Sequence, residues 1–155
     1  MPLAGTIVYA ADITPTDTYT GIIRETAAQS IGNGSATPIT FSTEDYDPAA
    51  GHSGSGSTYT PGVHGLYLVI GSGTVVANAA GRVELRIRVV STDIAQVAQP
   101  NSATSAPHMC VGTVVELSTT DTVSLVVFQN SGGSLNTSVA SGNPRLAVTM
   151  LKQLS

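Results

Sequence analysis

Hydrophobic and polar positions along this chain follow the two-residue period of β-strands. Residues 82–90 show it best, because apolar and charged side chains alternate strictly there. One side of such an extended segment carries Val83, Leu85, Ile87 and Val89, and the other side carries Arg82, Glu84, Arg86 and Arg88. A helix would scatter these charges around its circumference. The pattern therefore predicts a strand with one face on a core and the charged face in solvent.

Further short segments of this kind follow one another, separated by turn residues. We predict strands at 21–25, 37–42, 65–76, 94–99, 108–117, 122–129 and 145–151. The apolar segment 65–76 contains Gly71 and Gly73, which indicates a central strand that is buried on both faces or bent at a glycine. Many short strands with turn signals between them predict an all-β, antiparallel sandwich or barrel.

Residues 1–19 read differently and predict a separate N-terminal arm ahead of one domain at 20–155. The strand-forming residues of this arm are Thr6, Ile7, Val8, Tyr9 and Ala10. A polar linker interrupted by Pro15 follows them. We expect the arm to add as a strand to an exposed sheet edge of a partner, where backbone hydrogen bonds supply the contact. The alternative is that it extends its own sheet or that of a neighbouring subunit.

Composition narrows the function classes. At 155 residues the chain is long enough for one domain with a real core. A net charge of -4 with six basic residues argues against a nucleic-acid partner, whose phosphates need clustered Lys and Arg. No apolar run reaches the length that spans a bilayer, so we expect no membrane partner. The start of the chain lacks the basic segment of a signal peptide, and we expect synthesis in a cytoplasm.

Candidate chemistry is sparse. Glu44, Asp45 and Asp47 with His52 could bind a cation, but a solvated acidic turn is the simpler interpretation, because a calcium site needs six or more converging oxygens. Cys110, the one cysteine, is expected to be a small buried hydrophobe on a strand. The sequence contains no nucleophile elbow and no phosphate-binding loop before a helix. We expect no catalytic residue, no cofactor and no metal.

Two weak binding signals remain. Arg86 and Arg88 on one strand face could form an anion or sialic-acid site, but a solvated sheet face or subunit contact is favoured, because a bare row lacks a converging pocket. A sugar could stack only on a tyrosine, with Tyr19, Tyr46 and Tyr59 as candidates. Partly buried rings with a wet hydroxyl are the simpler interpretation of these tyrosines.

Several segments, in this order, resemble the globular head of complement C1q and its bacterial and phage relatives: 28–33, 38–41, 65–69, 82–90 and 115–136. Those heads are tumour-necrosis-factor-like jelly rolls that assemble as trimers. The resemblance covers roughly residues 20–151. It implies an all-β, C1q/TNF-like antiparallel jelly-roll sandwich and a homotrimer. The residues that we assign to the trimer interface or the core are Tyr67, Val69, Phe128, Leu146, Val148 and Met150.

The resemblance also suggests a role. No collagen-like stalk or coiled coil is seen before the head, which fits a knob that sits directly on a surface. We expect a non-enzymatic phage virion structural protein: a trimer that decorates the capsid surface and is anchored by its arm to the major capsid protein. The alternative is the receptor- or glycan-binding tip of a phage tail fibre or head fibre, which would bind a host-surface glycan or protein. A bacterial surface recognition module is a third possibility.

Overall fold

The computed structural model describes residues 19–140 and 142–155. The regular elements of this part are all β-strands, and it contains no helix long and apolar enough to cross a membrane. The strands are β1 (Thr20–Arg24), β2 (Ser30–Ile31), β3 (Ala36–Pro38), β4 (Thr43–Tyr46), β5 (Gly65–Thr74), β6 (Arg82–Val89), β7 (Thr92–Pro100), β8 (His108–Leu117), β9 (Val123–Gln129), β10 (Leu135–Asn136) and β11 (Arg145–Gln153). The predicted arm at 1–19 lies outside the described residues, except for Tyr19.

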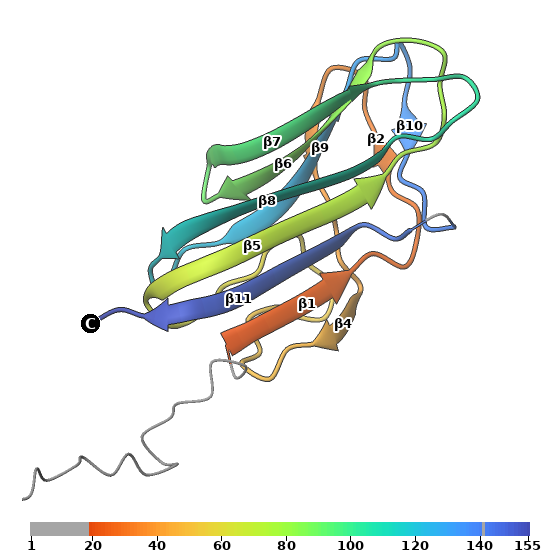
Figure 1. Ribbon diagram of the computed structural model, residues 1–155. Coiled ribbons are helices and arrows are strands. Elements are labelled where there is room, and N and C mark those ends of the chain that lie inside the picture. Colours follow the sequence, from red (N-terminus) through yellow and green to blue (C-terminus); the bar gives the residue numbers. More distant parts are fainter. Residues whose placement is uncertain (1–18, 141) are drawn as a thin grey trace, which may run out of the picture.

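Two antiparallel sheets lie face to face (Figure 1). One has five strands in the order β4-β1-β11-β5-β8, and the other has four in the order β3-β9-β6-β7. A short β10-β2 ladder joins two loops at one end. The first long strand therefore pairs with the last, since β1 and β11 are neighbours. This arrangement confirms the predicted antiparallel jelly-roll sandwich.

The core lies between the two sheets and is built from every second residue of each strand. Side chains of β5 and β11 meet those of β6 and β9 there. The buried members include Tyr67, Val69, Leu146, Val148 and Met150 from the first sheet and Val83, Leu85, Ile87, Leu125 and Val127 from the second. Burying one large aliphatic side chain contributes roughly 1.5–3 kcal/mol. The alternation predicted for 82–90 thus places its apolar side on the core, although Val89 is only partly buried.

β5 departs from the prediction of a strand buried on both faces. Its residues alternate between buried and partly exposed, and Ile70 is 39% exposed on the side away from the core. Gly71 points to the core side, where an added Cβ would lie 2.2 Å from Leu125 Cδ1. The glycine therefore lets the two sheets approach at Leu125 without bending the strand out of its ladders with β8 and β11.

The buried Tyr59 ring fixes the long connection between β4 and β5 to the sandwich. Its backbone exchanges two hydrogen bonds with Val123, N to O at 2.8 Å in both directions. The ring is fully buried, and this burial raises the pKa of the Tyr59 hydroxyl well above its usual range. An added Cβ would lie 2.1 Å from the ring at Gly21 and 2.5 Å from it at Gly51. Two glycines therefore make the space that the ring occupies.

We predict that Gly21→Ala destabilises the protein by roughly 1–3 kcal/mol, because a close-packed interior cannot move the Tyr59 ring aside without strain. Urea denaturation followed by circular dichroism measures the change. Gly133→Ala is the matched control, since a Cβ at Gly133 meets nothing within 4 Å. Its stability should stay within about 0.5 kcal/mol of the parent protein. Equal effects of the two substitutions would contradict this account of the Tyr59 pocket.

Candidate functional site

The outer face of the five-stranded sheet carries rows of side chains that the strand register aligns. One row runs from Gly112 through Ile70 and Ala147 to Ile22 and Tyr46. The next row contains Val114, Leu68 and Thr149. All of these residues alternate with core residues along their strands, so their side chains point away from the core.

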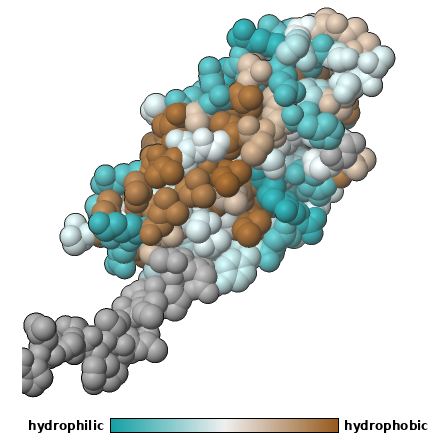
Figure 2. Space-filling view, viewed as in Figure 1, coloured by the Kyte–Doolittle hydropathy of each residue, from teal (hydrophilic) through white to brown (hydrophobic). Residues whose placement is uncertain are grey.

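Most of the large apolar side chains that are exposed among the described residues lie on this face. Among the described residues, six large hydrophobic side chains are exposed, and four of them lie here: Tyr46 (43%), Ile70 (39%), Val114 (52%) and Leu151 (48%). Figure 2 shows the apolar side chains gathered over β5, β8 and β11. A contiguous exposed apolar patch of this kind marks an interaction surface. We call it the apolar face.

The residues assigned from sequence to the trimer interface or the core have distinct places. Tyr67, Val69, Leu146, Val148 and Met150 are buried between the sheets of one chain. Phe128 lies on the outer face of the other sheet, and the Arg86 guanidinium covers its ring at 5.2 Å from the centroid. The exposed side chains of β5 and β11 are therefore their outward neighbours, such as Ile70 and Leu151. Sequence reasoning missed them because β5 is apolar at both alternating positions, which reads as a strand buried by its own domain.

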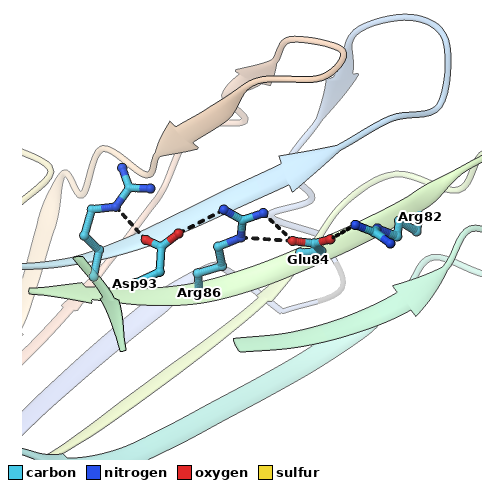
Figure 3. A network of polar contacts seen from close by, with 5 residues as sticks. Arg82, Glu84, Arg86 and Asp93 are labelled. Carbon is cyan, nitrogen blue, oxygen red and sulfur yellow. Dashed lines mark hydrogen bonds and ion pairs between the residues drawn. The ribbon is translucent and has the colours of Figure 1, made fainter. Parts of the chain in front are cut away.

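The charged row on the outer face of β6 forms a connected network of ion pairs (Figure 3). Arg82 Nη2 lies 2.6 Å from Glu84 Oε1, and Arg86 contacts the other Glu84 oxygen. On β7, Asp93 accepts from Arg86 at 2.9 Å and from Arg88 at 2.6 Å. The hydrogen bond from Arg88 holds the pKa of the Asp93 carboxyl below its usual range. The row is thus a sequence of alternating charges, and its arginines are engaged by carboxylates.

Glu84 corrects the prediction that this row faces solvent. It is only 4% exposed, because the guanidiniums of Arg82 and Arg86 cover it. Such a buried carboxylate is tolerated because it is paired on both sides. The arrangement supports the interpretation of Arg86 and Arg88 as a structural sheet surface, since Asp93 pairs with both guanidiniums and Glu84 pairs with that of Arg86.

The predicted acidic turn is in part a strand, because Glu44 and Asp45 lie on β4 and Asp47 follows it. Glu44 and Asp47 organise the loop after β4. Glu44 Oε1 accepts from His52 Nδ1 at 3.0 Å and from the Gly54 amide at 3.1 Å. Asp47 accepts from the backbone amides of Gly51 and His52. The hydrogen bond from His52 holds the pKa of the Glu44 carboxyl below its usual range. Within the described ranges, no three His, Cys, Asp or Glu side chains come together in a way that could hold a metal ion.

Two further side chains that could carry chemistry, Cys110 and Glu25, lie in surroundings that the sequence did not predict. Cys110 is exposed on the outer face of β8, which corrects the prediction of a buried cysteine. Glu25 follows β1 and is only 1% exposed. No hydrogen bond of normal geometry from the described residues reaches either Glu25 oxygen. Burial raises the pKa of the Glu25 carboxyl, and the nearby Thr137 hydroxyl and Gln29 amide oppose only part of the rise.

The comparisons with known proteins bear on the fold. No family model and no curated protein matches the sequence. Among solved structures, the globular domain of zebrafish complement 1qA aligns with a TM-score of 0.65 at 16% identity, over 87% of this chain and 98% of its own. The Eiger TNF of S. frugiperda aligns with a TM-score of 0.66 at 12% identity, over 88% and 94%. The fold is that of the C1q/TNF jelly rolls.

A third similar structure is a vertex protein of a phage. The vertex protein P5 of phage PRD1 aligns with a TM-score of 0.59 at 19% identity, over 86% of this chain and 96% of its own. The segments that carried the resemblance in the sequence lie on the C1q/TNF-like sandwich: 65–69 within β5, 82–90 along β6, and 115–136 from β8 to β10. The resemblance to a C1q/TNF-like jelly roll is therefore confirmed at the level of the fold.

The buried Glu25 gives this jelly roll a predictable pH response. Its pKa is raised above the ordinary 4.5, so the folded state holds the proton more tightly than the unfolded state does. The group therefore favours folding at low pH and costs stability as the pH rises from 4.5 through the raised value. We predict that Glu25→Gln raises the free energy of unfolding at pH 7 by roughly 1–3 kcal/mol, and that the gain fades below about pH 4.

Thermal and urea unfolding at both pH values measure this effect. Glu116→Gln is the control, because the Glu116 side chain is 64% exposed and its stability effect should stay within about 0.5 kcal/mol. A loss of stability in Glu25→Gln at pH 7 would show instead that the folded protein needs the carboxylate charge.

Proposed function

We propose that this protein is a non-enzymatic structural component of a phage virion, a homotrimer that decorates the capsid surface. The observation that carries the proposal is the apolar face on a C1q/TNF-like sandwich. The likeness to the PRD1 vertex protein supports a virion location. A role in assembly also fits the outer face of the four-stranded sheet, where Arg82, Glu84, Arg86, Arg88 and Asp93 form ion pairs with one another.

The homotrimer follows from the position of the apolar face. β5 is apolar at both alternating positions: one set fills the core, and the other set, with Leu68 and Ile70, remains outside. A second copy of this chain would bury the outer set as well. Fully burying one large apolar side chain in the contact stabilises it by roughly 1.5–3 kcal/mol. C1q/TNF-like heads assemble as trimers, and a closed threefold ring lets every copy cover its face by contact with a neighbour. We therefore assign two further copies of this chain to the apolar face.

Trimers match the symmetry of an icosahedral shell, whose local threefold positions present three equivalent sites. The predicted arm at 1–19 would reach the major capsid protein and add a strand to one of its sheet edges through Thr6, Ile7, Val8, Tyr9 and Ala10. Three arms on one trimer would strengthen a weak attachment through effective concentration.

The second candidate function is a receptor- or glycan-binding fibre tip. A polar groove lined by Arg24, Ser72 and Arg145, at one end of the five-stranded sheet, supports it.

We predict that the parent protein has three times the 15.7 kDa mass of one chain at micromolar concentration, and that Ile70→Glu reduces it to a monomer. A carboxylate in a buried apolar contact costs several kcal/mol, which is enough to dissociate the assembly. Light scattering after size exclusion measures the mass. Val76→Glu is the matched control, because Val76 is equally exposed at 39% but lies beyond the end of β5. A monomeric parent protein, or a trimeric Ile70→Glu, would contradict the assignment.

We predict separately that deleting residues 2–12 leaves the trimer intact but abolishes its binding to capsids from which the protein has been stripped. The reason is that the deletion removes the strand-forming part of the arm and leaves the jelly roll unchanged. Co-sedimentation with the stripped capsids measures the binding, and full-length protein is the control. Full binding by the truncated trimer would place the attachment on the jelly roll and end the proposal for the arm.

A further inference from the structure

β1 and β5 run toward the same end of the five-stranded sheet (Figure 1). A groove lies at this end. It consists of two adjoining cavities of about 260 and 420 Å³, which share Ser72, Gly142 and Asn143 as walls. Thr74, His108 and Cys110 complete the first cavity, and Arg24 and Arg145 complete the second. No residue of the groove takes part in the ion-pair network on β6.

The strand register explains why two arginines meet here. Arg145 in β11 pairs directly with Arg24 in β1 on one side and with Ser72 in β5 on the other. Like charges opposite each other destabilise a sheet unless a counter-charge is near. Asp45 in β4 supplies it: its oxygens lie 2.6 Å from Arg24 Nε and 3.1 Å from Arg145 Nη2. The guanidiniums of Arg24 and Arg145 thus hold the Asp45 carboxylate between them.

The groove retains positive charge and hydrogen-bond donors after this pairing. One carboxylate against two guanidiniums leaves one net positive charge. Asp45 engages one nitrogen of each arginine, whereas a guanidinium carries five N–H donors. The Arg24 and Arg145 side chains are 32% and 52% exposed, so a ligand can reach them. Ser72, Asn143 and His108 also line the groove, together with Gly73, Met109 and Cys110. His108 Nδ1 pairs with the Thr74 hydroxyl at 2.9 Å, and Asn143 Nδ2 donates to the Glu25 carbonyl at 2.8 Å, so the Ser72 hydroxyl, the Asn143 carbonyl oxygen and His108 Nε2 remain for a ligand.

We propose that this groove binds a carboxylate-bearing saccharide such as a uronic acid. The carboxylate would lie against the guanidiniums of Arg24 and Arg145, whose planar forks suit it. The sugar hydroxyls would meet the neutral polar groups that a phosphate or a simple ion does not need. The second cavity, of about 420 Å³, lies within the size range of small-molecule sites.

The proposal goes beyond the capsid role and does not depend on it, because one chain supplies every residue of the groove. The Arg24–Arg145–Ser72 row is the last outward row that β1, β11 and β5 share, next to the row of Ile22, Ala147 and Ile70. A copy bound to the apolar face would therefore have the groove at the rim of its contact. An acidic saccharide is also a chemistry by which a virion component would recognise a cell surface.

Titration calorimetry and amide NMR of the full chain test the proposal with three probes: digalacturonate, the uncharged disaccharide maltose, and inorganic phosphate. We expect saturable binding of digalacturonate, with shifts of the Ser72, Asn143 and Arg145 amides, at least tenfold tighter than either other probe. No saturable binding of digalacturonate, or equally tight binding of maltose, would overturn the proposal. Equally tight binding of phosphate would make the groove a general anion site and would also overturn it.

Variants separate recognition from a structural role. Arg145→Gln should weaken digalacturonate binding about tenfold or more, because it removes a charge-assisted contact. Arg82→Gln is the matched control with unchanged binding, since Arg82 is similarly exposed at 58% and is also paired with a carboxylate. Asp45→Asn should tighten binding by removing the competing charge, whereas a purely structural role predicts that this variant weakens it. Weaker binding by Asp45→Asn would overturn the proposal.

Circular dichroism and light scattering accompany each titration. A folded parent protein that binds digalacturonate as a monomer would support the groove and refute the homotrimer. A trimer that does not bind digalacturonate would do the reverse. Should Arg145→Gln fail to fold, Asp45→Asn alone decides, because its expected effect has the opposite sign to that of structural damage.

Discussion

The ladder between β5 and β11 is the interaction on which the rest of this structure depends. It joins the middle of the chain to its end, and β1 pairs with the other edge of β11. Because side chains alternate across a strand, this one ladder sends Tyr67 and Val148 into the core and Ile70 and Leu151 to the outside. The jelly-roll core and the apolar face are therefore two sides of the same pairing, and a register slip of one residue would exchange them.

The two sheets have different outer surfaces, and this difference distinguishes the surface that we propose faces a partner. On the four-stranded sheet, the arginines of β6 lie over apolar neighbours such as Phe128 and are held there by Glu84 and Asp93. That surface is polar and internally satisfied. The five-stranded sheet has apolar side chains in the same kind of outward position, and charged side chains such as Arg24, Glu116 and Arg145 lie toward the ends of its strands. We propose that this second surface is the one that gains by contact with another protein.

The charged residues of this chain are few, and their pairing gives them contrasting roles. The β6 network alternates in sign, so each arginine has a carboxylate on a neighbouring position. The Arg24–Asp45–Arg145 cluster has one carboxylate for two guanidiniums, and it lines a cavity. Both groups carry one net positive charge, because the β6 network has three arginines and two carboxylates. The distinction between a structural ion-pair surface and a candidate anion site thus depends on the adjoining cavity. The number of arginines in a row does not reveal it.

The sequence by itself determined the strands and the class of fold. The alternation at 82–90, the turns around 118–121 and the order of segments resembling a C1q head all correspond to elements of the sandwich. These signals are local, because a strand's period and a turn's residues are set by near neighbours. Tertiary structure alone decided which outward side chains remain exposed, that Glu84 is buried, and that Arg145 meets Arg24 and Asp45. The physical reason is that strand pairing joins residues far apart in the chain, and nothing in the local pattern states which strand lies beside which.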